Sequence, residues 1–203
     1  MTAPRRVIKL GGSLLTMAGL PAAFSRWLDR QPPAPNLLLV GGGALVDALR
    51  EIDRHNSLSE EAAHWASIAA MSATARVAAA VLPAARLVTG LDDAADWVGG
   101  GNLAVLDPLE FLQSHEPHCP GVKLPHCWEA TSDTIAARVA TILKAGELVL
   151  LKSSLPARGA ALAEMAEAGY VDPLLPKFAA PLRRVRFVNL RSKVAEEASR
   201  RTN

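Results

Sequence analysis

Lys9 is the first residue whose type and surroundings suggest chemistry, because it lies in an apolar stretch that runs directly into two glycines, Val7-Ile8-Lys9-Leu10-Gly11-Gly12-Ser13. Taking an unpaired ammonium group out of water is costly, so a buried Lys9 should meet an anion. Gly11 and Gly12 have no side chains, which leaves backbone N–H groups free to approach an oxyanion. The stretch therefore predicts a strand followed by a phosphate-binding loop, although a lysine at a strand end can also extend into solvent.

A second strand and glycine loop follow the same plan. Asn36 to Val40 is a nearly continuous apolar run, as expected for a parallel strand covered on both faces, and it enters Gly41-Gly42-Gly43. The chain has no G-x-x-x-x-G-K-S/T pattern, which excludes a P-loop nucleotide site. The loop half-matches the dinucleotide fingerprint, but Val46 stands where a small residue should pack, which argues against a Rossmann oxidoreductase.

Three more charged residues could act with Lys9 in phosphoryl transfer, a reaction that depends on positioned positive charge more than on covalent help. Lys152 ends an apolar strand at Glu147 to Lys152, and Lys177 lies in a Pro-Lys pair. Asp133 stands at the start of a helix, where its carboxylate could hold ammonium groups in register. The sequence thus predicts Lys9, Asp133 and one of the other two lysines as catalytic residues.

Residues after the second glycine loop could bind the molecule that accepts the phosphoryl group. Arg54, His55 and His64 lie on or beside helices there, and could donate hydrogen bonds to an acceptor phosphate. Trp128 could stack on a ring or cover a protonated amine. The alternatives are that His64 is a core residue of its helix, and that Arg54 and His55 are solvated at a helix end.

Three of the five histidines and both cysteines lie within 13 residues of each other. Nitrogen and thiolate ligands this close could hold zinc, although the spacing matches no standard zinc finger. A disulfide is a further alternative, and a loop beside an active site would also gather histidines for contact with a substrate. The residues concerned are His115, His118, Cys119, His126 and Cys127.

Strand and helix patterns alternate along the chain, which predicts an α/β fold with a mainly parallel sheet and its site at the carboxyl ends of the strands. Asp92-Asp93 is expected as an acidic turn, and residues 170–178 as a proline-rich loop. No linker divides the chain, so one domain over residues 1–203 is expected. Strands are expected at 5–10, 36–40, 86–89, 103–106, 147–152 and 185–190, and helices at 21–30, 44–55, 57–81, 108–113, 131–144 and 157–168.

The longest expected helix begins at Ser57-Leu58-Ser59-Glu60, which has the spacing of a capping box, and stops before Pro83. From Ala62 to Val81 its only charged residue is Arg76. The segment is too weakly hydrophobic to favour a membrane span. A helix that is apolar nearly all round is buried on two sides, so we expect it to pack on the sheet and on a second subunit, as a homodimer through helix 57–82.

Composition limits the class of protein further. Half of the 203 residues are apolar, so the chain can bury a core. Lys and Arg total 22 against 20 Asp and Glu, and the basic surplus lies largely after residue 182, which argues against a nucleic-acid surface. No signal-peptide pattern opens the chain, so a cytoplasmic protein without a membrane segment is expected. Two cysteines do not make a disulfide framework.

Three blocks in order resemble the signature motifs of the amino acid kinase family, which includes acetylglutamate, aspartate and uridylate kinases. The blocks read VIKLGGS from Val7, LLVGGGALVD from Leu38 and TSDTIAA from Thr131. The resemblance implies a three-layer αβα sandwich that uses ATP and Mg²⁺, with acceptor binding and dimer contacts in residues 1–130 and a short nucleotide-binding half in 131–203.

The resemblance also implies roles for single residues. The first glycine loop would serve the transferring phosphoryl group, the second would bind the acceptor, and Asp133 would orient the lysines. Lys152 matches the lysine of uridylate kinases and Lys177 that of acetylglutamate kinases, and the sequence does not choose between them. The implied nucleotide-binding residues are Gly11, Gly12, Ser13, Ser132, Lys152 and Ser153, and the implied acceptor-binding residues are Gly41, Gly42, Gly43, Arg54, His55, His64, His126 and Trp128.

Within the family, the chain is most similar to small kinases linked to methanofuran and tetrahydromethanopterin one-carbon pathways. The residues that carry this similarity are His55, Ala63-His64-Trp65, Ala70-Met71, Leu124-Pro125-His126 and Trp128. The archaeal relatives phosphorylate an aminomethylfuran-methyl phosphate, so this likeness implies a phosphomonoester acceptor. Ser153-Ser154-Leu155-Pro156 replaces the acidic turn of larger members. Two alternatives stay open: a non-catalytic anion- or metal-binding storage or regulatory protein, and an amino-acid carboxylate kinase.

Overall fold

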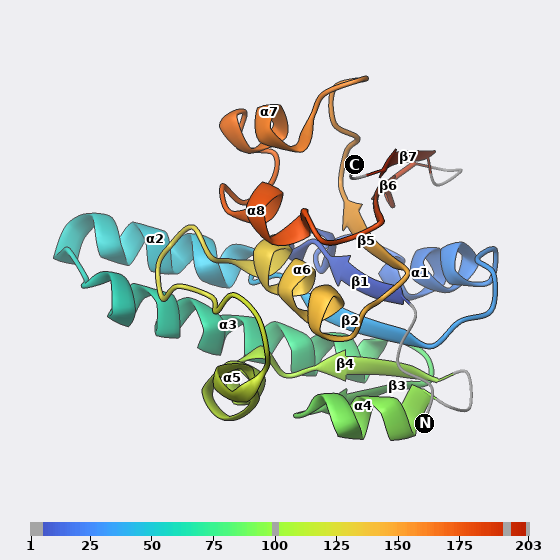
Figure 1. Cartoon of the computed structure of the whole chain (residues 1–203), viewed down its shortest axis with the longest axis horizontal. Coiled ribbons are helices and arrows are strands. Elements are labelled where there is room, and N and C mark those ends of the chain that lie inside the picture. The colour runs from blue at the N-terminus through green and yellow to red at the C-terminus, as the bar shows by residue number, and fades with distance from the viewer. Residues whose placement is uncertain (1–5, 99–101, 193–195, 202–203) are drawn as a thin grey trace.

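The computed structural model describes residues 6–98, 102–192 and 196–201 of the chain. Its seven strands form one sheet in the order β3-β4-β2-β1-β5-β6-β7, in which β1 to β6 are parallel and β7 is antiparallel to β6. Figure 1 shows helices on both faces of this sheet, so the predicted α/β fold is confirmed. The strands are β1 (Arg6–Leu10), β2 (Asn36–Val40), β3 (Ala85–Val88), β4 (Leu103–Leu106), β5 (Glu147–Lys152), β6 (Arg184–Asn189) and β7 (Glu196–Arg201).

The helices connect the strands, and short 3-10 and π-helical turns adjoin two of the loops. A 3-10 turn, η1 (Gly12–Leu14), follows β1 directly, and the π-helix η2 (Phe111–His115) and the 3-10 turn η3 (Glu116–His118) continue α5. The α-helices are α1 (Leu20–Leu28), α2 (Ala44–Asn56), α3 (Glu60–Val81), α4 (Leu91–Val98), α5 (Pro108–Glu110), α6 (Ser132–Ile142), α7 (Leu162–Glu167) and α8 (Leu175–Ala179).

Side chains of the central strands alternate between two buried clusters, one on each face of the sheet. Val7 and Leu39 belong to the cluster that includes the apolar side chains of α6 and α8. Ile8 and Leu10 belong to the other cluster, which includes the aromatic side chains of α1. Lys9 lies two residues after Val7, so the alternation directs it to the face that α6 covers.

The long helix α3 is present nearly as expected. Its cap is Ser59, whose side chain accepts a hydrogen bond from the Ala62 N–H at 3.2 Å, while Ser57 has a positive φ of 51° and ends α2. Among the residues that the structure describes, no helix combines the length and hydropathy needed to cross a membrane.

Three local predictions were wrong, each for a physical reason. Asp92 and Asp93 were expected in a turn outside any helix, but they lie in the first turn of α4, where carboxylates are favourable because they face a helix N-terminus. The helix expected at 157–168 is limited to α7, since Gly159 has a φ of 87° that a helix cannot hold. The expected loop at 170–178 contains α8, in whose first turn Pro176 loses no helical hydrogen bond.

The strand β7 was not predicted from the sequence. Its six residues, EEASRR, have no alternating apolar pattern, yet they pair with β6 in a register that places Arg184 opposite Arg201 and Asn189 opposite Glu196. A strand at the edge of a sheet is held by backbone hydrogen bonds and does not need a buried face. Hydrophobic periodicity therefore gave no signal for it.

Candidate active site

Two lysines and an aspartate meet where β1 and β5 end. Lys9 lies opposite Leu150 in the register of these parallel neighbours, and Lys152 follows Leu150 by two residues, so both lysines leave the same face of the sheet. The Lys9 Nζ lies 2.8 Å from Asp133 Oδ1, and the Lys152 Nζ lies 2.7 Å from Asp133 Oδ2. Asp133, in the first turn of α6, thus bridges both ammonium groups.

The charges of this triad depend on one another. Burial alone would raise the pKa of Asp133, but the ammonium groups of Lys9 and Lys152 outweigh it and hold the pKa at about 2. Burial and the charge of Lys9 lower the pKa of Lys152, against the pull of Asp133. Lys152 also donates to the Tyr170 carbonyl at 2.8 Å. With both lysines protonated, the triad carries one net positive charge beside a cavity.

Asp172 holds the start of α6 and was not identified from the sequence. Its carboxylate accepts hydrogen bonds from the Thr131 hydroxyl at 2.6 Å and from the backbone N–H groups of Asp133 at 2.8 Å and Thr134 at 3.0 Å. Thr131 stands at the N-cap position of this helix, but its side chain does not cap it. Burial and the nearby charge of Asp133 raise the pKa of Asp172. A cap supplied from 39 residues further along the chain leaves no local pattern.

The two glycine loops touch each other, which explains why they need glycine. A Cβ on Gly12 would lie 2.1 Å from the Gly43 nitrogen, and one on Gly42 would lie 2.0 Å from a methyl carbon of Val46. Gly43 also has a φ of 54°. The glycines therefore permit close backbone approach, in addition to leaving N–H groups exposed to an anion.

The N–H groups of the loops divide into two sets. Those of Gly11 and Gly41 extend the sheet, since they donate to the carbonyls of Leu151 and Leu10, each at 2.9 Å. Within the described part of the chain, the N–H groups of four other loop residues that line the cavity have no hydrogen-bond acceptor. These four are Gly12, Ser13, Gly42 and Gly43.

A cavity of about 390 Å³ lies above the triad, between the two loops. Residues at the starts of α2 and α6 and in the first half of α3 line it, together with residues 127–128, 130–133 and 169–173. Ser132 and His64 are both among them. Free N–H groups and ammonium groups on one wall of a cavity are suited to bind phosphate.

Arg50 reaches this cavity, whereas the sequence had predicted Arg54 in this role. Arg50 lines the cavity, pairs with Asp47 at 2.9 Å, and lies 5.7 Å from the centre of the Trp128 ring. Arg54 and His55 are exposed, are paired with Glu51, and are not among the lining residues. Arg50 lies three residues after Asp47 and Arg54 three residues after Glu51, so charge spacing on α2 did not distinguish the two arginines.

Trp128 lines the cavity and is fixed in place by its neighbours. Its Nε1–H donates to Asp53 at 2.9 Å, at the end of α2. His126 is exposed and stacks on the ring of His64 with 5.0 Å between ring centres, so it supports a lining residue and does not itself line the cavity.

Two predicted residues of the nucleotide half are not part of the cavity wall. Lys177 is exposed on α8 and Ser153 follows β5, and neither lines the cavity. Of the two lysines between which the sequence could not choose, Lys152 is the one that contacts Asp133.

The histidines and cysteines of the 115–127 region do not converge. His115 packs against Gly90, and Cys119 donates to the His115 carbonyl at 3.4 Å, whereas Cys127 lines the cavity. Both cysteines are free thiols. Across residues 6–98, 102–192 and 196–201, no three His, Cys, Asp or Glu side chains are grouped so that they could hold a metal ion. The zinc alternative therefore has no ligand cluster to support it.

The sequence of residues 4–154 matches the model of the amino acid kinase family. The chain belongs to the amino acid kinase family. As a member of that family it is a kinase, which agrees with lysines and free N–H groups gathered around a cavity. No curated protein matches the chain significantly.

Solved structures of kinases share the fold. Uridylate kinase from Archaeoglobus fulgidus aligns with a TM-score of 0.59 and 17% identity, over 90% of this chain and 88% of that one. UMP kinase from Bacillus anthracis aligns with a TM-score of 0.63 and 12% identity, over 95% and 90%. Aspartate kinase from Synechocystis gives a TM-score of 0.63 and 14% identity, over 98% of this chain and 40% of that one. These structural matches show the fold, and neither they nor the family model singles out the methanofuran-linked kinases.

Proposed function

We propose that this member of the amino acid kinase family transfers the γ-phosphoryl group of ATP to a small molecule that already carries a phosphomonoester. The observation that carries the proposal is the Lys9–Asp133–Lys152 bridge at the floor of the cavity. In phosphoryl transfer the charge spreads over the oxygens of the moving group, and fixed positive groups stabilise it. Lys9 and Lys152 are held for this purpose by one shared carboxylate.

In this mechanism the chain binds, orients and shields the reacting groups. The N–H groups of Gly12 and Ser13 donate to phosphate oxygens of the nucleotide, whose other contacts come from Ser132 and Lys152 on the cavity wall. The second glycine loop holds the acceptor in line with the phosphorus atom. Closure of the cavity around both molecules keeps water away from the transferring group. We assign the acceptor to residues 1–130 and the nucleotide to residues 131–203.

Magnesium fits this site as an ion carried by the nucleotide. Asp133 already pairs with two ammonium groups, and Asp172 accepts three hydrogen bonds. In kinases the ion is held largely by phosphate oxygens, by water and by one or two carboxylates, so a protein cage is not needed. When bound with ATP, Mg²⁺ would neutralise part of the charge on the β- and γ-phosphates.

The phosphate of the acceptor has a suitable place at the start of α2. The free N–H groups of Gly42 and Gly43 precede this helix of 13 residues, whose N-terminus favours an anion. Arg50, two turns along the same helix, supplies a guanidinium group on the cavity wall. Together they favour a phosphomonoester over a carboxylate acceptor, because a phosphate presents more oxygens and more charge.

The finer proposal is an aminomethylfuran-methyl phosphate as acceptor, in the formation of a methanofuran-type cofactor. Aromatic side chains near the acceptor end favour a flat ring, since Trp128 lines the cavity and Trp65 and His126 pack around His64. The likeness to the methanofuran-linked kinases, which the sequence suggested, adds to this support.

The test supplies ATP and Mg²⁺ with a panel of acceptors: an aminomethylfuran-methyl phosphate, UMP, N-acetylglutamate and aspartate. Mass spectrometry is expected to find a diphosphate product from a phosphomonoester. An acyl phosphate, which hydroxylamine would cleave, would support a carboxylate kinase instead. If ATP is not consumed with any of the acceptors, and the purified protein contains bound phosphate or metal, a storage protein would be favoured.

We also propose a homodimer formed through α3. Alanines and valines recur on its outer side at a spacing of three or four residues, and Val77 and Val81 are 51% and 44% exposed. Exposure of these apolar side chains to water is unfavourable, and packing against α3 of a second copy would bury them. The exposed residues of this stripe are Ala69, Ala73, Val77, Ala80 and Val81.

A further inference from the structure

The imidazole of His64 has a defined arrangement of hydrogen atoms. Its Nδ1 lies 3.2 Å from the carbonyl oxygen of Cys127. A carbonyl oxygen only accepts hydrogen bonds, so Nδ1 must carry the hydrogen in this contact. In the neutral ring the other nitrogen, Nε2, is then an acceptor with a free lone pair.

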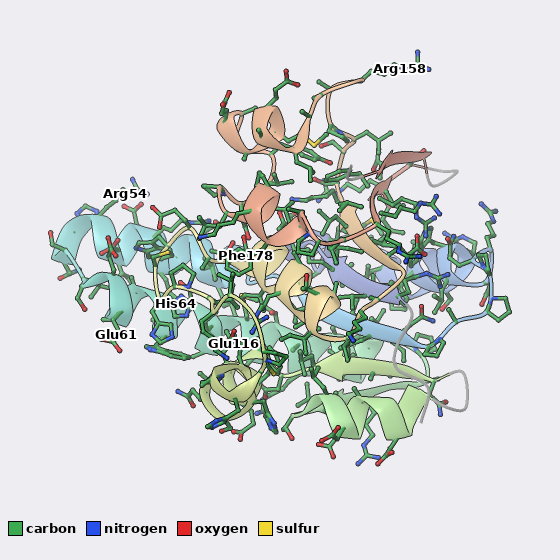
Figure 2. The ribbon with its side chains drawn as sticks, in the orientation of Figure 1. Arg54, Glu61, His64, Glu116, Arg158 and Phe178 are labelled. Carbon is green, nitrogen blue, oxygen red and sulfur yellow. The ribbon has the colours of Figure 1, made fainter. Side chains whose placement is uncertain are left out.

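The surroundings of the ring favour its neutral form. His64 is only 2% exposed, and burial lowers its pKa, as does the nearby His126. The hydrogen bond to Cys127 and the charge of Glu61 act in the opposite direction without reversing the shift. Figure 2 marks His64 and Glu61, both on the first turns of α3.

Two buried polar atoms on α3 lack partners at the acceptor end of the cavity. His64 Nε2 and Ser67 Oγ have no hydrogen-bond partner among the residues that the structure describes, and both residues line the cavity. They are three residues apart, which places them on one face of the helix. Buried polar atoms are nearly always hydrogen-bonded in folded proteins, so two such atoms together call for a ligand.

The ring is also held rigidly, as a recognition group should be. The Cys127 carbonyl fixes one edge, His126 stacks on its face at 5.0 Å, and Trp65 meets it edge-on at 5.1 Å. A group fixed before binding loses little conformational entropy when the ligand arrives.

We propose that His64 Nε2 and Ser67 Oγ form a specificity site for a hydrogen-bond donor, an amine or a hydroxyl group, carried by the acceptor on the side away from its phosphate. The proposal rests on the proposed function, because it assumes that the acceptor occupies this end of the cavity. A phosphate oxygen does not suit Nε2, since both are acceptors. The sequence had suggested His64 as a donor to phosphate, and the Cys127 contact assigns it the opposite role.

The first test compares three probes: furan-methyl phosphates that carry an aminomethyl, a hydroxymethyl or a methyl group on the ring. The wild-type protein should phosphorylate the first two with kcat/KM about 10- to 100-fold higher than the methyl probe, because the methyl group leaves the buried acceptor unpaired. A preference of the aminomethyl over the hydroxymethyl probe would identify the donor as an amine.

Variants link this preference to the two side chains. His64→Phe should remove most of the discrimination against the methyl probe. Ser67→Ala changes little volume and should reduce the same discrimination, so the test can still be made if His64→Phe does not fold. His55→Ala is the matched control, because His55 is exposed and outside the cavity, and it should keep the full preference.

The outcomes separate the two proposals. Equal kcat/KM for the aminomethyl and methyl probes would overturn the specificity site and leave the kinase proposal intact. If none of the three probes is phosphorylated, the proposed acceptor class is wrong and the specificity site is rejected with it. Nitrogen-15 NMR of the whole protein reads the tautomer without activity: Nδ1–H with a bare Nε2 is expected, and a hydrogen on Nε2 would overturn the proposal.

Discussion

At the scale of single residues, the site is organised by one carboxylate. Asp133 contacts both Lys9 and Lys152, so the spacing of the two ammonium groups depends on its position. Removing either lysine still leaves Asp133 paired with the other. Removing Asp133 leaves two cations facing each other in a buried place, which is far more costly.

Lys9→Ala should therefore lower kcat by about 10²- to 10³-fold with only a small change in the free energy of unfolding. Lys177→Ala is the control, because Lys177 is exposed and does not line the cavity. An assay coupled to ADP release gives kcat, and urea unfolding gives stability. An active Lys9→Ala protein, or an inactive Lys177→Ala protein, would contradict the assigned roles.

The pKa of Asp133, about 2 in the folded chain, lies below its ordinary value of 3.8. The ionised carboxylate therefore stabilises the fold above about pH 4, and this contribution is lost as the pH falls through about 2. Asp133→Asn should be less stable than wild type at pH 6, with a difference that shrinks toward pH 2. Urea unfolding across this range measures it, and a difference that is constant with pH would refute the shift.

At the scale of elements, α6 carries the catalytic aspartate in its first turn, and Asp172 fixes that turn through hydrogen bonds to Asp133 and Thr134. The cap comes from the segment before α8, within residues that were predicted to form a loop. A movement of the helix start would shift Asp133 relative to both lysines. The stability of this turn and the geometry of the site are thus linked.

Asp172→Ala should lower the free energy of unfolding by about 1–2 kcal/mol, as loss of a cap does, and should also lower kcat more than tenfold. Ser59→Ala removes the cap of α3 and is the matched control: it should cost a similar amount of stability and leave kcat nearly unchanged. If both variants change kcat equally, Asp172 acts only through stability. Rescue of kcat by Asp172→Asn would show that hydrogen-bond acceptance, and not charge, is what it supplies.

At the scale of the whole molecule, one helix serves both the site and the proposed dimer contact. The first turns of α3 supply His64 and Ser67 to the cavity, and the outer side of the same helix carries the exposed valines. Subunit contact through α3 would therefore also fix the helix that lines the acceptor end.

Val77→Glu should convert the dimer to a monomer, because it places a charge where two copies of α3 meet. Sedimentation or light scattering of the purified protein gives the mass. Val122→Glu is the control, since Val122 is 60% exposed and lies away from α3 in the chain. A wild-type protein that is monomeric at micromolar concentration would refute the dimer through α3.

Much of the fold followed from the sequence by itself. Apolar runs predicted β1, β2, β4 and β5, and the Ser57–Glu60 capping-box spacing predicted α3, although the structure caps this helix with Ser59 and begins it at Glu60. These signals depend on a residue and its near neighbours. The glycine loops after β1 and β2 were identified for the same reason, as were Lys9, Lys152 and Asp133.

Only the tertiary structure decided which charges meet. It brought Lys152 and not Lys177 to Asp133, Arg50 and not Arg54 to the cavity, and Asp172 to the start of α6. It also paired β7 with β6. These contacts join residues distant in the chain, and the direction in which each side chain points depends on register and packing, which local patterns do not contain.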